Sequence, residues 1–248
     1  MSYPYFFVDS NNIAEDKIKI DGEDLNHLKN VLRSRAGEVV YISDNETYSY
    51  KTEILEIGKS EAILNIKDKK RIIRKLPRLT LFQCVLKKNS MEFVIQKATE
   101  IGVDRIIPVM SRRVIADGEK ISGKIERWQK ISDGASKQSK RDFKCEITEP
   151  EYIYSIKVSE YGLFYVPYEE STAEDENITE TLKSLSGVTD IAYIIGPEGG
   201  FEQKEIEFLK KSGAREIRLG RNIYRSETAA IYFLSVLDYL IRNQNEQK

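Results

Sequence analysis

The order of hydrophobic and polar positions divides the chain into two parts with different patterns. Up to about residue 66, short runs rich in β-branched and aromatic residues alternate with Asp, Asn and Gly turns, which predicts strands. The strands expected are residues 39–42, 48–57 and 62–66. One helical pattern interrupts them over residues 22–33, with Leu25, Leu28 and Leu32 on one face. We therefore expect a small β-barrel-like domain at the start of the chain.

After Pro77, apolar runs alternate with helical patterns, the order typical of a parallel sheet. The strands expected here are residues 79–86, 105–109, 161–166, 191–195 and 216–219. The helices expected run from Ser90 to Gly102, from Ser122 through Ile125, Trp128, Ile131 and Ala135, over residues 173–185 and 202–211, and from Ser226 onward. Ser90 and Ser226 suit helix N-caps, and Gly102 suits a helix end.

A charge-rich stretch, residues 67–77, separates the two parts and ends in proline. Few core residues can come from it, so we place the domain boundary there. The expected domains are residues 1–72 and 73–248.

Two loops in the second part each join the end of a strand to the start of a helix. Gly196-Pro-Glu-Gly-Gly-Phe201 follows one strand, and Leu219-Gly-Arg-Asn-Ile-Tyr-Arg-Ser-Glu-Thr-Ala229 follows another. Ligands bind at the carboxyl ends of strands in open α/β sheets. The glycines of the first loop can take positive φ and let the backbone approach a flat ligand closely. Two such loops in tandem favour a ligand site over purely architectural turns.

Composition narrows the class of protein. Hydrophobic residues make up 40% and charged residues 32%, which is typical of a folded chain. No run approaches the ~18 apolar residues of a membrane span, and the first residues lack the pattern of a secretory signal. Cys84 and Cys145 form no CxxC pair, and there is one histidine, so no metal site is expected. We expect a reduced, cytoplasmic protein without membrane contact.

The charge pattern favours local patches over a globally basic surface. The net charge is -1 and the pI about 6.1, so steering of nucleic acid by the whole molecule is weak. Basic patches occur at residues 67–78, 87–88, 112–113 and 137–144. Each patch alone is typical of a solvated face, and only their convergence around a cleft indicates an RNA site.

The two loops together closely resemble the bacterial 16S rRNA uridine N3-methyltransferase family. That family belongs to the SPOUT (α/β-knot) class of enzymes, which use S-adenosylmethionine. The resemblance continues through Gln96-Lys-Ala-Thr-Glu-Ile-Gly-Val103, Gln138-Ser-Lys-Arg141 and His27-Leu-Lys-Asn-Val-Leu-Arg33, so it covers nearly the whole chain. The two loop motifs are highly specific when they occur together.

The resemblance implies a fold, partners and a reaction. It implies a small N-terminal PUA-like RNA-binding β-barrel domain and a C-terminal SPOUT-type α/β domain with a parallel sheet and a trefoil knot. It also implies a homodimer that acts on 16S rRNA of the small ribosomal subunit. The chain departs from the family at Tyr3 and Tyr5, where relatives commonly carry arginine, although tyrosines can stack on bases. Gly134 and the absence of proline after Arg141 are further departures.

The resemblance and the loop chemistry together indicate which residues hold the cofactor. Glycine-rich main chain and nearby apolar side chains can supply amide and carbonyl partners and a slot for the adenine ring. The residues expected at the cofactor are Val166, Pro167, Ile195, Gly196, Pro197, Glu198, Gly199, Gly200, Leu219, Gly220, Ile223, Tyr224, Arg225, Thr228 and Ala229.

Methyl transfer to uridine N3 requires loss of the imide proton, so a base or a cation that favours the uracil anion is needed. Arg225 and Glu227 are the catalytic candidates. For Glu227 the alternative is a structural carboxylate in the first turn of a helix. For Glu198 the alternative to a role as base is likewise a structural one, in which its carboxylate stabilises the turn.

Basic and polar residues outside the loops are the candidates for RNA contacts. A target base must lie in a loop or be flipped out to be methylated on its Watson–Crick edge. The candidates are His27, Arg33, Arg35, Arg112, Arg113, Lys137, Gln138 and Arg141. For His27 and Arg33 the alternative is an ordinary polar surface.

Other functions remain as hypotheses. One is a noncatalytic RNA-binding protein, and another is a SPOUT enzyme acting on tRNA or on a ribose 2′-hydroxyl. A G-x-S-x-G elbow and a G-x-G-x-x-G fingerprint are both missing, which argues against a hydrolase and a dehydrogenase.

Overall fold

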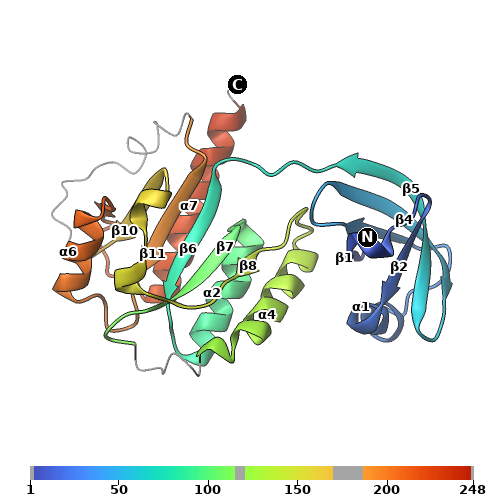
Figure 1. Cartoon of the computed structure of the whole chain (residues 1–248), viewed down its shortest axis with the longest axis horizontal. Helices are drawn as coiled ribbons and strands as arrows, with labels where there is room; N and C mark the ends of the chain where they lie inside the picture. Colours follow the sequence, from blue (N-terminus) through green and yellow to red (C-terminus); the bar gives the residue numbers. More distant parts are fainter. Residues whose placement is uncertain (1–2, 115–120, 170–186, 247–248) are drawn as a thin grey trace. The chain divides into compact units, whose positions relative to one another are not determined.

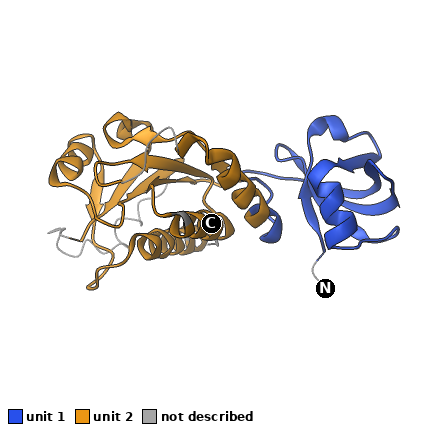
Figure 2. Ribbon diagram, turned by 90° about the horizontal axis from the view of Figure 1, so that it is seen from below, with its two compact units in different colours: residues 1–74, 136–144 blue, residues 75–135, 145–248 orange. Residues whose placement is uncertain are grey.

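The computed structural model describes residues 3–114, 121–169 and 187–246. The chain forms two compact units, which Figure 2 shows in different colours. The first contains Met1–Arg74 and Ser136–Lys144, and the second contains Lys75–Ala135 and Cys145–Lys248. The helix expected at 173–185 lies outside the described residues.

The first unit is built on a five-stranded mixed sheet with strand order β1-β3-β4-β5-β2. β1 runs parallel to β3, and the other neighbours are antiparallel. The strands are β1 (Tyr5–Phe7), β2 (Lys17–Asp21), β3 (Val39–Ser43), β4 (Tyr48–Ile57) and β5 (Glu61–Arg71), and a short 3-10 turn, η1, covers Ser10–Asn12. Apolar residues such as Phe6, Ile18 and Leu64 form its own core. The expectation of a small β domain is confirmed.

The helix of this unit ends differently from the prediction. α1 (Gly22–Asn26) continues into a π turn, η2 (His27–Val31), in which the Leu32 amide donates to the His27 carbonyl at 3.0 Å. Leu25 and Leu28 are buried, but Leu32 is 42% exposed. The prediction for Leu32 was wrong because the wider π turn rotates the following side chains away from the core face.

A segment far along the chain completes the first unit. The Ser43 hydroxyl donates to the Asp142 carbonyl at 2.6 Å, and the Lys144 amide donates to Asn45 Oδ1 at 2.8 Å. The Arg74 guanidinium lies over the Phe143 ring, 4.1 Å from its centroid. The charge pattern of residues 137–144 gave no indication of this role.

The second unit is built on a seven-stranded parallel sheet with the order β12-β10-β11-β6-β7-β8, and β9 also pairs with β7. The strands are β6 (Arg78–Cys84), β7 (Arg105–Met110), β8 (Glu146–Ile147), β9 (Glu151–Tyr152), β10 (Leu163–Pro167), β11 (Asp190–Ile195) and β12 (Arg215–Ile217), and two 3-10 turns, η3 (Ile153–Ser155) and η4 (Val158–Glu160), follow β9. The predicted parallel sheet is confirmed (Figure 1).

Helices cover both faces of this sheet. They are α2 (Lys88–Ile101), α4 (Ile125–Gln138), α6 (Gln203–Lys211) and α7 (Ser226–Glu246). Tyr193 of β11 packs into one core with α2, α4 and α7, whereas its neighbour Ile194 packs into the other core with α6. Alternate residues of the buried strands therefore serve opposite layers. No helix in the described part of the chain is long and apolar enough to cross a membrane.

Three helix starts differ from the sequence expectation. Lys87, and not Ser90, is the N-cap of α2, and α4 begins at Ile125 instead of Ser122. Ser226 is the first helical residue of α7, because the Arg225 carbonyl already accepts the Ala229 amide at 2.8 Å. The predicted end of α2 at Gly102 is confirmed, since Gly102 takes a φ of 138°. Serine therefore marked the helix starts only approximately.

Candidate functional site

The two glycine-containing loops line one cavity of about 440 Å³ in the second unit. The first loop follows β11, and the second leads into α7. Pro167 at the end of β10 and Lys87 after β6 complete the wall. β10, β11 and β6 are neighbours in the sheet, so their carboxyl ends meet at one edge. The volume lies within the roughly 300–1,000 Å³ of small-molecule sites.

A smaller cavity of about 60 Å³ adjoins the first and shares Pro167, Glu169, Ile223, Tyr224 and Ala229 with it. The predicted cofactor residues that line the larger cavity are Pro167, Ile195, Gly196, Pro197, Glu198, Gly200, Ile223, Tyr224, Arg225 and Ala229. Leu219 and Gly220 line the smaller one. Val166, Gly199 and Thr228 are not in the lining of these two cavities. Val166 is instead buried in the core beside α6.

The glycines of the first loop are required for different reasons. Gly200 has a φ of 70°, but Gly196 and Gly199 do not take positive φ. A Cβ on Gly196 would lie 3.1 Å from the ring of Phe201, which is 6% exposed. The positive-φ expectation was therefore wrong for Gly196 and Gly199. At Gly196 the requirement is the close approach of an aromatic ring.

A buried glutamine joins the two loops. Gln83 lies at the end of β6, where it pairs with Ile195 of β11. Its Nε2 donates to Ser226 Oγ at 3.1 Å and to the Cys84 carbonyl at 3.0 Å. Ser226 Oγ in turn donates to the Gly196 carbonyl at 2.5 Å. We did not predict Gln83, although a polar residue inside an apolar strand pattern was the available signal.

Glu198 is tied to the start of α2. Its Oε1 accepts the Lys87 amide at 3.1 Å, which holds the first loop against the helix N-terminus. This contact agrees with the turn-stabilising alternative for Glu198. Lys87, Ser90, Glu169 and Phe201 also line the cavity, and sequence reasoning assigned none of them to the site.

The two catalytic candidates flank Ser226 and line the same cavity. Arg225 is exposed, and Glu227 is half-buried in the first turn of α7. The Tyr224 ring packs against Tyr232, 5.3 Å between centroids, and the Tyr224 hydroxyl would lie 3.2 Å from a Cβ on Gly220. The loop therefore presents a guanidinium and a carboxylate beside glycine-rich main chain.

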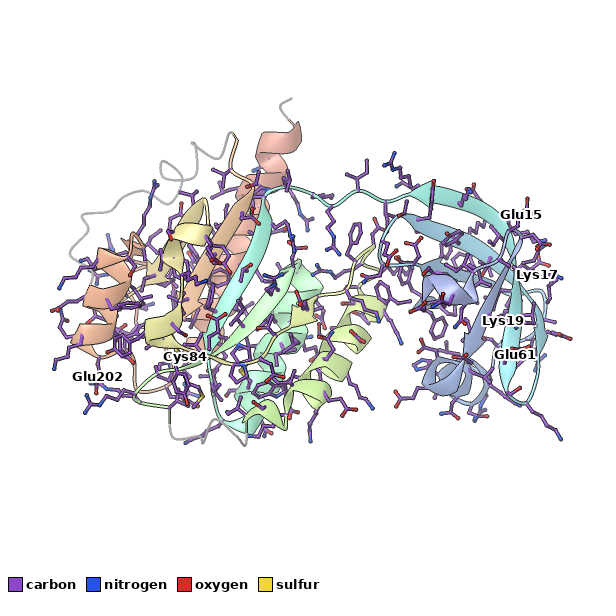
Figure 3. The ribbon with its side chains drawn as sticks, in the orientation of Figure 1. Glu15, Lys17, Lys19, Glu61, Cys84 and Glu202 are labelled. Carbon is purple, nitrogen blue, oxygen red and sulfur yellow. The ribbon has the colours of Figure 1, made fainter. Side chains whose placement is uncertain are left out.

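Arg112 and Arg113 lie at the edge of the first loop. Arg113 donates to the Gly199 carbonyl at 2.6 Å, and Arg112 is 3.6 Å from a carboxylate oxygen of Glu202, at the start of α6 (Figure 3). The fully buried Glu205 accepts the amides of Arg112 at 2.9 Å and of Glu202 at 2.8 Å. The segment after β7 is thus fixed to the cofactor loop.

The other RNA candidates lie in the first unit, where some have structural partners. His27, Arg33, Arg35 and Gln138 are exposed. The His27 ring packs edge-to-face on Phe6, 5.9 Å between centroids. Lys137 pairs with Asp24 at 2.5 Å, and Arg141 Nε donates to the Phe143 carbonyl at 3.1 Å. Lys137 and Arg141 therefore also hold the Ser136–Lys144 segment.

The tyrosines near the N-terminus differ in accessibility. Tyr3 is 48% exposed and lies 5.7 Å from the Tyr41 ring, between centroids. Burial raises the pKa of Tyr5 well above its usual value, with a further contribution from Asp142, and the Tyr5 hydroxyl is inaccessible. Only Tyr3 of the two can present its ring edge and hydroxyl to a base.

Cys84, which follows Gln83 at the end of β6, is buried. Burial raises the pKa of the Cys84 thiol, so it stays protonated at neutral pH. The described residues contain no cluster of side chains able to hold a metal ion.

Comparison with known proteins shows extensive similarity. A sequence model of an RNA methyltransferase domain matches residues 74–238, and one of an RNA methyltransferase PUA domain matches residues 20–67. Ribosomal RNA small subunit methyltransferase E from Mesomycoplasma hyopneumoniae is 33% identical, covering 93% of this chain and 96% of its own. The protein of that name from Bacillus subtilis is 28% identical, covering 89% of each chain. A protein from Legionella pneumophila, solved with bound S-adenosylmethionine, has a TM-score of 0.83 and 27% identity, covering 96% of this chain and 98% of its own.

Proposed function

The chain belongs to the ribosomal RNA small subunit methyltransferase E family, and from this membership we propose that it methylates N3 of a uridine in 16S rRNA with S-adenosylmethionine as methyl donor. The observation that carries the proposal is that both loops line one cavity with Arg225 and Glu227. The Legionella pneumophila relative was solved with S-adenosylmethionine bound. The PUA-like unit of the same chain supplies the RNA-binding module that such a substrate needs.

The cavity fits the methyl donor in size and chemistry. Main chain of Gly196 and Gly200 lines the cavity with amide and carbonyl groups, and Ile195, Ile223 and Ala229 supply apolar wall. When bound, the donor supplies an electrophilic methyl group on a sulfonium. The residues of the chain then need only to position the reactants and to favour the deprotonated base.

Arg225 and Glu227 divide these tasks in the proposal. The exposed guanidinium of Arg225 stabilises negative charge that develops on the uracil oxygens as N3 loses its proton. The half-buried carboxylate of Glu227 lies one residue beyond Ser226, and it is the group that accepts that proton in this proposal. Its location in the first turn of α7 also stabilises the helix N-terminus.

The test of the function is nucleoside analysis of small-subunit rRNA by mass spectrometry. Cells lacking the protein should lose one N3-methyluridine, and purified protein with labelled S-adenosylmethionine should restore it on small subunits from those cells. A missing ribose methyl, or methyl transfer to tRNA, would identify another SPOUT substrate. Absence of any transfer and of S-adenosylmethionine binding by calorimetry would leave a noncatalytic RNA-binding protein.

We predict that Arg225→Ala lowers the turnover number by about 10²-fold while changing the dissociation constant of S-adenosylmethionine less than threefold. The reason is that removal of one donor to a developing oxyanion costs about 2.7 kcal/mol of transition-state stabilisation. Single-turnover methylation and calorimetry measure the two quantities. Unchanged turnover would remove Arg225 from catalysis.

A homodimer, which the family resemblance implies, is part of the proposal. Ile223 of the second loop is 80% exposed, Tyr239 of α7 is 64% exposed and Phe93 of α2 is 46% exposed, so the second unit presents large apolar side chains to solvent. Light scattering on the full chain decides between monomer and dimer.

A further inference from the structure

The carboxyl end of β6 contains a buried polar group that neither the loop motifs nor the proposed chemistry requires. Gln83 is fully buried and Ser226 is 8% exposed. They connect three elements that are far apart in sequence: the end of β6, the first loop and the start of α7. The question is what a hydrogen-bonded amide does at the buried end of this strand.

The direction of the hydrogen bonds is fixed by one acceptor. The Cys84 carbonyl can only accept, so the Gln83 side-chain atom 3.0 Å from it must be the amide nitrogen. That same nitrogen donates to Ser226 Oγ at 3.1 Å. The proton of the Ser226 hydroxyl is then available for the Gly196 carbonyl, 2.5 Å away. The chain of donors runs from Gln83 through Ser226 to Gly196.

The amide oxygen of Gln83 argues against a role in stability alone. Gln83 Oε1 is buried and has no hydrogen-bond partner among the described residues. A buried acceptor without a partner lowers the stability of the fold, and an apolar side chain of the same shape at that position can be neutral or stabilising. A residue that lowers stability in this way is typical of a functional site.

We propose that Gln83 and Ser226 are positioning residues that set the spacing between the two cofactor loops. Their hydrogen bonds join the Gly196 carbonyl to the first turn of α7, and both ends of this connection line the cavity. Ser226 is flanked by Arg225 and Glu227, so the same contact also fixes the catalytic candidates relative to the first loop. This inference rests on the proposed function, because it concerns how the site holds its methyl donor.

The first test compares cofactor binding with thermal stability in the full-length protein. Ser226→Ala removes the hydrogen bond to the Gly196 carbonyl, and Gln83→Met removes the donor that orients the Ser226 hydroxyl toward that carbonyl; both change the side-chain volume little. We expect each to weaken S-adenosylmethionine binding about tenfold by calorimetry, which is the effect of one hydrogen bond. Gln83→Met should leave the melting temperature unchanged or higher, since it also removes the unpaired oxygen.

The matched control is Ser132→Ala, at a buried serine of α4 in the same unit. The Ser132 hydroxyl donates to the Cys145 carbonyl at 2.9 Å and lies 3.2 Å from Thr99 Oγ1, and Ser132 does not line the cavity. This variant should lower the melting temperature with cofactor affinity unchanged. If Ser226→Ala and Gln83→Met behave like Ser132→Ala, the positioning role is wrong.

The combined variant tests whether the two residues act in series. Gln83 reaches Gly196 only through Ser226, so Gln83→Met together with Ser226→Ala should bind S-adenosylmethionine about as weakly as either single variant. Two independent effects would instead multiply to about a hundredfold loss. A loss of affinity of that size in the combined variant would show that Gln83 does not act through Ser226.

A pH profile gives a signature that packing alone does not produce. In Gln83→Glu the introduced carboxyl donates one hydrogen bond when protonated and none when ionised, and burial raises its pKa. The affinity of the Gln83→Glu variant for S-adenosylmethionine, relative to that of the wild type, should therefore fall as the pH rises from about 5 to 8. A constant ratio would contradict the donor role. Failure of the wild-type protein to bind S-adenosylmethionine would instead refute the proposed function.

Discussion

At the scale of single residues, the ring of Phe201 decides which residue the chain can carry at position 196. Sequence reasoning assigned the loop glycines to backbone freedom, but only Gly200 uses it. Position 196 holds glycine because the Phe201 ring packs directly on its Cα and leaves little room for a Cβ. This ring belongs to the core beneath α6. The first glycine-containing loop is therefore anchored to the hydrophobic core through the Phe201 side chain.

Gly196→Ala should weaken S-adenosylmethionine binding by about tenfold, because relieving a 3.1 Å contact with a buried ring displaces the loop. The control is Gly134→Ala in α4, where a Cβ has nothing within 4 Å. That change should stabilise the protein by about 0.5–1 kcal/mol through helix propensity, with binding unchanged. Calorimetry measures the affinity for S-adenosylmethionine, and thermal melting measures the stability of each variant. Equal affinity in Gly196→Ala and wild type would show that the loop tolerates the ring displacement.

At the scale of elements, the start of α6 links the cofactor loop to the segment after β7. Glu202 and Glu205 form a capping box, and the second carboxylate oxygen of Glu205 reaches the Arg112 amide. One buried side chain thus satisfies donors from two elements, which explains how a charged residue is retained in the core.

Glu205→Ala should destabilise the protein by about 2 kcal/mol, because it leaves the partly buried amides of Glu202 and Arg112 without their carboxylate acceptor. For a chain of this size the melting temperature should fall by about 4–8 °C. Glu207→Ala on the exposed face of the same helix is the control and should be nearly neutral. A neutral Glu205→Ala would mean that other groups satisfy those amides.

At the scale of the whole molecule, the RNA candidates occur in both units. His27, Arg33 and Arg35 belong to the PUA-like unit, whereas Arg112 and Arg113 belong to the parallel-sheet unit. The two groups differ in their local partners, because Arg113 is bonded to the cofactor loop itself. The trefoil knot implied by the family resemblance stays a prediction at this scale.

Arg33→Gln combined with Arg35→Gln should weaken binding to small-subunit rRNA and reduce the slope of log affinity against log salt by about 1.4, with cofactor affinity unchanged. Arg113→Ala should weaken both RNA and S-adenosylmethionine binding, since its guanidinium holds the Gly199 carbonyl. Lys19→Ala is the control, because Lys19 is paired with Glu61 across neighbouring strands (Figure 3). An unchanged salt slope in the arginine pair would exclude phosphate contacts there.

The sequence by itself determined the two-part organisation, the alternation of strands and helices, and the location of the two glycine-containing loops. These features depend on local periodicity and on glycine and proline placement, which the chain displays within a few residues. Tertiary structure alone decided which partners these elements receive. Gln83 and Ser226 are 143 residues apart, and Ser136–Lys144 completes a unit whose other residues end at Arg74. Such contacts are set by the packing of distant elements, so no local pattern could indicate them.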